Sequence, residues 1–345
     1  MKHNKSIGIT IKDIARYTGY SIATVSRVSN EYGVFYSKET YKKIKKAIDD
    51  LNYYPNVIAR SLKTQRTYNI AFLEPWTSEF FSEIFLGIKN SAYKAGYTVA
   101  IFSSNFDKTH EDRNISSILS NRMDGVIISS AILNNDSINK LISHNIPLVI
   151  IEKFIDLKDV PTISIKNLEI SRKAVNYLLE LGHKKIGFIG ETLEVGRVDS
   201  RFRGYKKALE EKGVAFNQEY IFISEKFVGE DYFESFKYLT KNIQKIKNCT
   251  AFFITSDSIT ITLIKALKNS GLSVPGDVSV IGFDGLEISK YINPSLTTIL
   301  QPRYEMGHQA MRMLLKVIKG EKTDNVELKA ELVIGESTAP YSEKT

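Results

Sequence analysis

The chain has 345 residues, 43% of them hydrophobic, and a formal net charge of +8 at pH 7. This length favours more than one domain, and the composition supplies enough apolar side chains for a sizeable buried core. The single cysteine, Cys249, excludes an intramolecular disulfide and argues against a cysteine-based zinc site. The chain starts without a continuous apolar segment, and no apolar run reaches 18 residues, so we expect a cytoplasmic protein that does not enter a membrane.

The net positive charge is confined to the first fifth of the chain. Residues 1–67 hold 13 of the 47 Lys and Arg but only 5 of the 39 Asp and Glu, a net charge of +8. Residues 68–345 keep 34 of each sign and are neutral overall. A basic head on a neutral body favours a polyanion bound by the head alone. A solvated, lysine-rich helix face is the alternative explanation.

The head is predicted to form three short helices, the first two of which fit a helix-turn-helix. Thr10, with Asp13 three residues later, is a capping signal for the first helix, and Gly19 ends that helix. Ser21 is the expected cap of the second helix and Ser37 of the third. The expected core side chains of the head are Ile11, Ile14, Ala15, Val25, Val28, Tyr41, Ile44, Ile48 and Leu51.

Beyond a polar linker at residues 63–67, short apolar runs alternate with helical patterns. Near-continuous apolar strands separated by helices are typical of parallel sheets covered on both faces. The runs form two series, which predicts two similar α/β lobes that bind a ligand near the carboxyl ends of their strands. The expected strands are 70–73, 99–102, 126–128, 148–151, 186–189, 220–223, 251–254 and 278–281.

Signatures of the common enzyme classes are missing. The chain has no Walker A motif, no HExxH, no GxSxG, and no GxGxxG after a strand. None of the five histidines stands at metal-ligand spacing from another. We therefore expect no catalytic residues, no cofactor and no bound metal, which disfavours an enzyme such as a carbohydrate-active dehydrogenase.

Nearly the whole chain resembles the lactose/galactose repressor family. In the head, the matching motifs are TIKDIA at residues 10–15, Gly19, SIATVSRVSN at 21–30, and LNYYPN at 51–56 followed by ARSL at 59–62. Further along the chain they are EFF at 79–81, DGVI at 124–127, RFRGY at 201–205, VPGDVSVIGFD at 274–284 and PSLTTI at 294–299. The resemblance implies a ligand-controlled transcription factor, usually a repressor, that binds a pseudo-palindromic double-stranded DNA operator as a homodimer.

The fold implied by the resemblance is an all-α helix-turn-helix headpiece followed by a two-lobed, periplasmic-binding-protein-like α/β domain with parallel sheets flanked by helices. The headpiece is expected at 1–54, a hinge helix and linker at 55–67, and an effector-binding and dimerisation domain at 68–345. Lobe 1 of that domain is expected at about 68–164 and 301–325, and lobe 2 at about 165–300 and 326–340.

A recognition helix places its N-terminal residues against base edges in the major groove. Arg27 can pair bidentately with a guanine, whereas Ile22 and Ala23 offer only apolar contacts. Packing between the helices is the alternative role of Ile22 and Ala23. The residues expected to contact bases are Ile22, Ala23 and Arg27, and those expected at the DNA backbone are Thr10, Ser21, Thr24 and Asn30.

Residues 56–63 resemble the family's hinge helix. Eight residues are too few for a stable isolated helix in water, so we expect this helix to form only when two copies pack together over DNA. Asn56, Ala59 and Leu62 are the expected minor-groove residues, with Leu62 as an apolar wedge that unstacks the central base step. An ordinary interdomain linker is the alternative.

In the family, an arginine of an RxxG-aromatic motif and an aspartate after a strand ending in IGFD or IGYD bind the effector. These residues correspond to Arg201 and Asp284, and a guanidinium together with a carboxylate can bind adjacent hydroxyls. Trp76 either lines the same cleft or packs within its lobe. The expected effector-binding residues are Phe80, Phe81, Glu152, Arg201, Phe227, Ser256, Asp284 and Gln301.

Two positions in the effector-binding domain depart from the family pattern. Ser256-Asp257 stands where Asn-Asp is usual, so a hydroxyl replaces an amide. Arg303 follows Gln301 where many sugar-binding members have an aromatic or neutral residue. An additional cation in the cleft favours an anionic effector, such as a sugar phosphate or a sugar acid, over a neutral sugar. The alternative is that Arg303 starts a helix and points to solvent.

Two other functions stay open at this point: a carbon-catabolite-type regulator controlled by a protein corepressor, and a solute-binding protein. The basic head and the missing signal peptide argue against the second. The sequence does not distinguish a repressor from an activator, an inducer from a corepressor, or a dimer from a tetramer, and it identifies neither the effector nor the operator and its genes.

Overall fold

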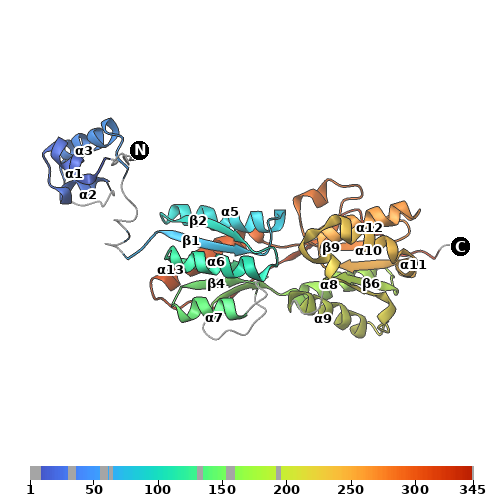
Figure 1. Cartoon of the computed structure of the whole chain (residues 1–345). Helices are drawn as coiled ribbons and strands as arrows, with labels where there is room; N and C mark the ends of the chain where they lie inside the picture. The colour runs from blue at the N-terminus through green and yellow to red at the C-terminus, as the bar shows by residue number, and fades with distance from the viewer. Residues whose placement is uncertain are drawn as a thin grey trace, which may run out of the picture. The chain divides into compact units, whose positions relative to one another are not determined.

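The structure is a computed structural model that describes residues 9–29, 36–54, 61, 65–129, 135–152, 160–191 and 196–343. The chain divides into two compact units, Met1–Thr67 and Tyr68–Thr345. In Figure 1 the first unit is a small group of helices, and the second consists of two α/β lobes. Among the described residues, no helix is both long enough and apolar enough to cross a membrane.

The headpiece contains the three expected helices, α1 (Ile11–Thr18), α2 (Ile22–Ser29) and α3 (Lys38–Asp50). Gly19 ends α1 in the left-handed region, at a φ of 76° that glycine adopts at little cost. Ser21 Oγ accepts from the Thr24 amide, and Ser37 Oγ accepts from the Thr40 amide, both at 3.1 Å. The three helices share one buried cluster, formed by Ile14, Val25, Val28, Ile44, Ala47 and Tyr53.

Lobe 1 contains a sheet with the strand order β11-β5-β4-β3-β1-β2, in which all paired strands are parallel. Helices α5 and α13 cover one face of this sheet, and α6 and α7 cover the other. The strands are β1 (Asn69–Glu74), β2 (Thr98–Ser103), β3 (Gly125–Ser129), β4 (Leu148–Ile151), β5 (Thr162–Ile165) and β11 (Val326–Leu328). The helices are α5 (Glu79–Lys94), α6 (Lys108–Ser120), α7 (Asn135–Ser143) and α13 (Arg303–Ile318).

Lobe 2 contains a sheet with the order β12-β10-β9-β8-β6-β7, parallel except for the pairing of β12 with β10. Its strands are β6 (Ile186–Gly190), β7 (Ile221–Ile223), β8 (Ala251–Ile254), β9 (Ser279–Asp284), β10 (Thr297–Leu300) and β12 (Glu331–Val333). Its α-helices are α8 (Asn167–Glu180), α9 (Gly196–Glu211), α10 (Tyr232–Lys241), α11 (Ile243–Ile246) and α12 (Asp257–Asn269). Short 3-10 helices lie at η1 (Gln218–Tyr220), η2 (Glu225–Glu230) and η3 (Glu287–Lys290).

The expected fold class is confirmed, and each expected strand overlaps an observed one. The sequence does not predict β5, β10, β11 or β12, because each includes Thr, Ser or Glu among its three or four residues and so does not form a continuous apolar run. The structure also differs from the expected lobe border near residue 325. Strand β11 pairs in parallel with β5 of lobe 1, so the last crossing between the lobes falls between β11 and β12.

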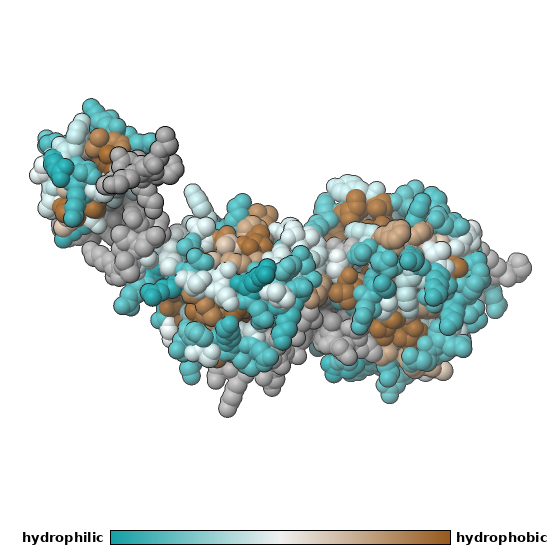
Figure 2. All heavy atoms as spheres, in the orientation of Figure 1, coloured by the Kyte–Doolittle hydropathy of each residue, from teal (hydrophilic) through white to brown (hydrophobic). Residues whose placement is uncertain are grey.

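Apolar strands that are covered by helices on both sides leave a mostly polar outer surface. Figure 2 shows this surface on the visible face, where hydrophobic residues gather in separate patches on both lobes. Several of the most exposed apolar side chains are aromatic: Tyr93 on α5, Phe233 on α10 and Tyr291 after η3. The core is therefore closed within each lobe, and these aromatic residues remain available on its surface.

Candidate functional site

Helix α2 presents an exposed face away from the headpiece core. Ile22 is 46% exposed, and Ala23 and Arg27 are also exposed, whereas Val25 and Val28 on the opposite side are fully buried. Ile22 and Ala23 are therefore not used to pack the described core. Exposed apolar side chains and an exposed guanidinium on one helix can contact a thymine methyl and a guanine edge.

Hydroxyl groups lie at the N-terminal ends of the first two helices. The amide and the hydroxyl of Thr10 both donate to Asp13 Oδ2, at 3.0 and 2.6 Å, and these hydrogen bonds lower the pKa of Asp13. Ser21 Oγ and Thr24 Oγ1 lie 2.9 Å apart at the start of α2. Helix N-termini with hydroxyl groups suit phosphate oxygens. Four expected DNA contacts lie outside the described residues: Asn30, Asn56, Ala59 and Leu62.

A pocket lies between the two lobes, where the carboxyl ends of the strands of both sheets meet. The space between its walls is roughly 400 Å³ when the adjoining open solvent is included, and the closed cavity itself is much smaller. Lobe 1 contributes residues that follow β1 and β4 and residues from the start of α5, and lobe 2 contributes residues around β6, β8, β9, α9 and η2. The described lining residues are Trp76, Phe80, Phe81, Glu152, Glu191, Arg201, Phe227, Thr255, Ser256 and Asp284.

The structure brings the expected effector-binding residues together in this pocket, with one exception. Gln301 lies behind the pocket wall, where its Nε2 donates to Asp284 Oδ1 at 2.8 Å. Trp76 lines the pocket and also packs edge-on against Phe81. Sequence reasoning missed Glu191 and Thr255, although Thr255 directly follows a predicted strand, as Glu152 does, and Glu191 comes two residues after one.

Buried polar atoms in the pocket wall have no partner within the described part of the chain. They are Trp76 Nε1, Glu152 Oε1 and Thr255 Oγ1. Glu152 is 2% exposed and adopts a φ of 59°, and Asp284 adopts a φ of 120°, which is strained for a non-glycine residue. Such strain and unpaired polar atoms are uncommon in ordinary cores and gather at binding sites. A ligand with both donors and acceptors would satisfy these atoms.

Arg201 is fixed within lobe 2 from three sides. Its guanidinium lies 3.5 Å above the centre of the Phe283 ring. Its Nε donates to Asn167 Oδ1 at 3.0 Å, and its Nη1 donates to the Thr255 carbonyl at 2.7 Å. These contacts set the orientation of the buried cation in the pocket wall before any ligand arrives.

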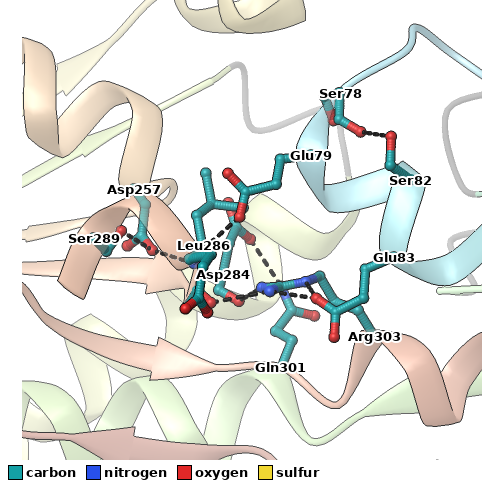
Figure 3. Close-up of polar contacts among 12 residues, drawn as sticks. Ser78, Glu79, Ser82, Glu83, Asp257, Asp284, Leu286, Ser289, Gln301 and Arg303 are labelled. Atoms are coloured by element: carbon teal, nitrogen blue, oxygen red, sulfur yellow. Dashed lines mark hydrogen bonds and ion pairs between the residues drawn. The ribbon is translucent and has the colours of Figure 1, made fainter. Parts of the chain in front are cut away.

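The structure contradicts both expectations for Arg303, which were a ligand-binding cation in the cleft and a side chain that points to solvent. It is the first residue of α13, but it is 4% exposed and does not point to solvent. It does not line the pocket either, because its guanidinium forms an ion pair with Glu83 and donates to the carbonyls of Asp284 and Gly285. Figure 3 shows this side chain between α5 and the turn after β9. Arg303 therefore gives no support for an anionic effector, since Glu83 already neutralises this cation.

Asp257, at the start of α12, holds the same turn from lobe 2. Its Oδ2 accepts from the Leu286 amide and the Ser289 hydroxyl, each at 2.8 Å, and its Oδ1 accepts from Thr298 at 2.6 Å. Complete burial raises the pKa of Asp257 to about 6, against the lowering effect of these hydrogen bonds. Asp257 is thus a structural anchor, and the pocket wall at Asp284 is braced from both lobes.

Family comparisons cover both units of the chain. The family described as bacterial regulatory proteins, lacI family, matches residues 10–56, and the periplasmic binding protein-like domain matches residues 175–338. The HTH-type transcriptional regulator RegA of Clostridium saccharobutylicum is 34% identical over 333 residues, 95% of this chain and 99% of that protein.

Two solved structures extend the comparison. The lac repressor dimer bound to operator and the anti-inducer ONPF matches with a TM-score of 0.83 at 25% identity, over 96% of this chain and 99% of that one. A periplasmic binding protein/LacI transcriptional regulator from Alkaliphilus metalliredigens, complexed with D-xylulofuranose, matches with a TM-score of 0.70 at 26% identity, over 79% of this chain and 99% of that one.

Proposed function

Because the chain belongs to the lacI family of bacterial regulatory proteins, and is thus a DNA-binding transcriptional regulator, we propose that it acts as a repressor with a sugar-like effector. In this proposal a homodimer in the cytoplasm binds a pseudo-palindromic operator, and the ligand in the interlobe pocket sets its affinity for DNA. The protein catalyses no reaction. It uses the free energy of ligand binding to shift between two states that bind DNA differently.

The observation that carries the DNA-binding half of the proposal is the exposed face of α2. Ile22, Ala23 and Arg27 project from a helix whose other face is closed by the headpiece core. Arg27 supplies a bidentate contact to guanine, and Ile22 and Ala23 supply apolar contacts to thymine methyl groups. Thr10, Ser21 and Thr24 then contact the DNA backbone and fix the orientation of α2 in the major groove.

The composition of the pocket supports a polyhydroxylated ligand of the sugar type. Glu152 and Asp284 offer carboxylate acceptors, Arg201 offers donors, and Ser256 offers a hydroxyl. The rings of Phe80, Phe81 and Phe227 line the same cavity and suit the apolar face of a sugar ring. The D-xylulofuranose in the related Alkaliphilus structure supports the same ligand class. A neutral sugar is preferred over a sugar phosphate or a sugar acid, because Arg303 is paired with Glu83.

Exposed apolar side chains on both lobes support the homodimer. On α5, Leu86 and Tyr93 are exposed and lie seven residues apart, which places them on one face of the helix. In lobe 2, Ile288 and Tyr291 are exposed close together at η3. A second copy of the chain would cover these patches, and two headpieces would then match the two halves of the operator. The hinge proposed from the sequence, with Leu62 as its wedge, also requires two copies.

An unbiased DNA selection with the purified full-length protein tests the proposal. The expected result is a pseudo-palindrome with half-sites about one helical turn apart, whose affinity falls steeply with salt as phosphate contacts release counterions. The enriched site is then titrated with pentoses, hexoses, sugar phosphates and sugar acids. Only non-specific DNA binding, both for the protein alone and with cell extract added, would contradict the proposal. A site enriched only with extract would indicate a protein corepressor.

A further inference from the structure

The turn that follows β9 is held by lobe 1 as well as by its own lobe. The Leu286 side chain is 2% exposed and belongs to the buried cluster of lobe 1 that contains Phe80, Phe81 and Met306. The Glu287 amide donates to Glu79 Oε1 of α5 at 2.5 Å. Side chains of lobe 1 thus help to hold the end of a lobe 2 strand in place.

Arg303 makes the most extensive of these contacts. Its Nη1 and Nη2 donate to the carbonyls of Asp284 and Gly285, while its Nε donates to Glu83 Oε2 at 2.6 Å. A guanidinium has donors on several edges of one plane, so a single side chain can hold two carbonyls and a carboxylate together. Glu83 is half-exposed on α5, whereas the bonds to the two carbonyls are buried. Figure 3 shows Arg303 between Glu83 and Asp284.

The backbone at the held carbonyls is strained and needs this support. Asp284 has a φ of 120° and Gly285 a φ of 66°. A Cβ on Gly285 would also collide with Leu300, so only glycine fits there. Strained residues persist when surrounding contacts over-determine them, and they can relax when one contact is lost. Asp284 is the proposed ligand carboxylate, so its position depends on Arg303.

We propose that Arg303 is a positioning residue that holds Asp284 in its binding conformation and couples the turn after β9 to helix α5 through Glu83. The inference rests on the proposed function, because it assigns a role in regulation to that same pocket. Movement of Asp284 on ligand binding changes the contacts of Arg303, and Glu83 transmits this change to α5, which carries the proposed dimer face. Helices α5 and α13 pack too closely to shift independently, so Glu83 and Arg303 respond together.

Hydrogen exchange of the full-length protein, without DNA or ligand, tests this coupling. The measured region is residues 285–291, and the variants are Arg303→Met, Glu83→Gln and the double variant. Each single variant is expected to accelerate exchange in this region by at least about tenfold, because Arg303→Met removes the hydrogen bonds to the turn and Glu83→Gln removes the negative charge that holds the guanidinium in place. Because Glu83 acts on the turn only through Arg303, Glu83→Gln is expected to add nothing to Arg303→Met.

Two controls separate coupling from general loosening. Glu79→Ala removes the acceptor of the hydrogen bond from the Glu287 amide and is expected to add its full effect in the Arg303→Met background. Arg312→Met changes an exposed residue of the same helix and should leave residues 285–291 unchanged. Exchange in β8 reports whether lobe 2 remains folded. If Arg303→Met unfolds lobe 2, exchange of residues 285–291 in Glu83→Gln still tests the proposal. Unchanged exchange in Glu83→Gln would overturn the proposal, and so would a double variant whose effect equals the sum of the two single effects. Neither outcome bears on operator binding or sugar binding, which the DNA selection and the sugar titration measure.

Discussion

Gly87 of α5 and Gly307 of α13 lie at the closest contact between these two helices, and neither position has room for a methyl group. A Cβ on Gly87 would collide with the Tyr304 carbonyl, and a Cβ on Gly307 would collide with the Ile84 carbonyl. The obstacle in each case is backbone, which cannot turn aside as a flexible side chain can. This contact fixes the face of lobe 1 that carries Glu83 and Arg303.

We expect Gly87→Ala to destabilise the protein by at least about 2 kcal/mol, because overpacking against backbone forces the two helices apart. Urea unfolding of the purified protein measures the effect. Lys89→Ala, at an exposed position of the same helix, is the matched control and should change stability little. A Gly87→Ala variant as stable as the control would mean that α5 and α13 can separate at low cost.

Arg27→Ala should remove preference at one base position of the operator, at a cost of about 1–3 kcal/mol for the preferred base. The reason is the loss of a bidentate guanine contact from an exposed side chain of α2. Binding to the selected site and to its single-base variants measures this preference. Lys42→Ala, on the exposed face of α3, should instead weaken binding to all sequences alike. The same uniform loss in Arg27→Ala would make Arg27 a phosphate contact.

Asp284→Asn should leave operator binding without ligand unchanged and abolish the response to the sugar that regulates the wild-type protein. Asn keeps the size of the side chain but removes the negative charge that accepts hydrogen bonds from ligand hydroxyls. Operator titration with and without the sugar measures both quantities. Glu287→Gln, at an exposed residue three positions later, should retain the response. A normal sugar response in Asp284→Asn would exclude this carboxylate from the binding site.

His183 makes the stability of lobe 2 depend on pH. Its Nε2 donates to the Ala339 carbonyl at 3.1 Å, and its Nδ1 lies 3.0 Å from Thr250 Oγ1. Burial lowers the pKa of His183 below its usual value of 6.5, against the raising effect of the hydrogen bond to Ala339. The unfolded chain therefore binds a proton at a higher pH than the folded one.

The contribution of His183 is fully present above pH 6.5 and is lost as the pH falls toward the lowered pKa of the folded protein. We expect the free energy of unfolding of the wild-type protein relative to that of His183→Gln, both measured with urea, to be lower at pH 5.5 than at pH 7.5. The buried Asp257 carboxyl, whose raised pKa acts in the opposite direction, titrates in both proteins and cancels in this comparison. An equal difference between the two pH values in both proteins would assign the acid sensitivity to other groups.

The proposed dimer depends on aromatic side chains that are strongly exposed in one chain. Tyr93 is 83% exposed and Tyr291 is 75% exposed. The double variant Tyr93→Asp, Tyr291→Asp should sediment as a monomer at micromolar concentration, because the interface would have to bury two carboxylates. Phe233→Asp, at an aromatic residue of α10 that is 72% exposed, should leave the dimer intact. A dimeric double variant would place the interface on another face.

The fold class could be predicted because each part of it depends on a local pattern. The caps at Ser21 and Ser37, and the break at Gly19, lie within a few residues of the helices that they delimit. The apolar strands of the body are continuous runs, since both sheet faces are buried. Strands β11 and β12 escaped prediction because each has a glutamate among its three residues, and only their partners in the two sheets distinguish them.

The sequence alone determined the basic headpiece and placed Glu152 and Asp284 at the ends of two strands. The family resemblance then assigned both residues to one cleft. The tertiary structure decided the role of Arg303, because its partners Glu83 and Asp284 lie 220 and 19 residues away along the chain. The effect of a charged residue on ligand binding depends on the groups around it, and the sequence does not show which groups these are. The structure pairs Arg303 with a carboxylate and turns an expected ligand-binding cation into a brace between the lobes.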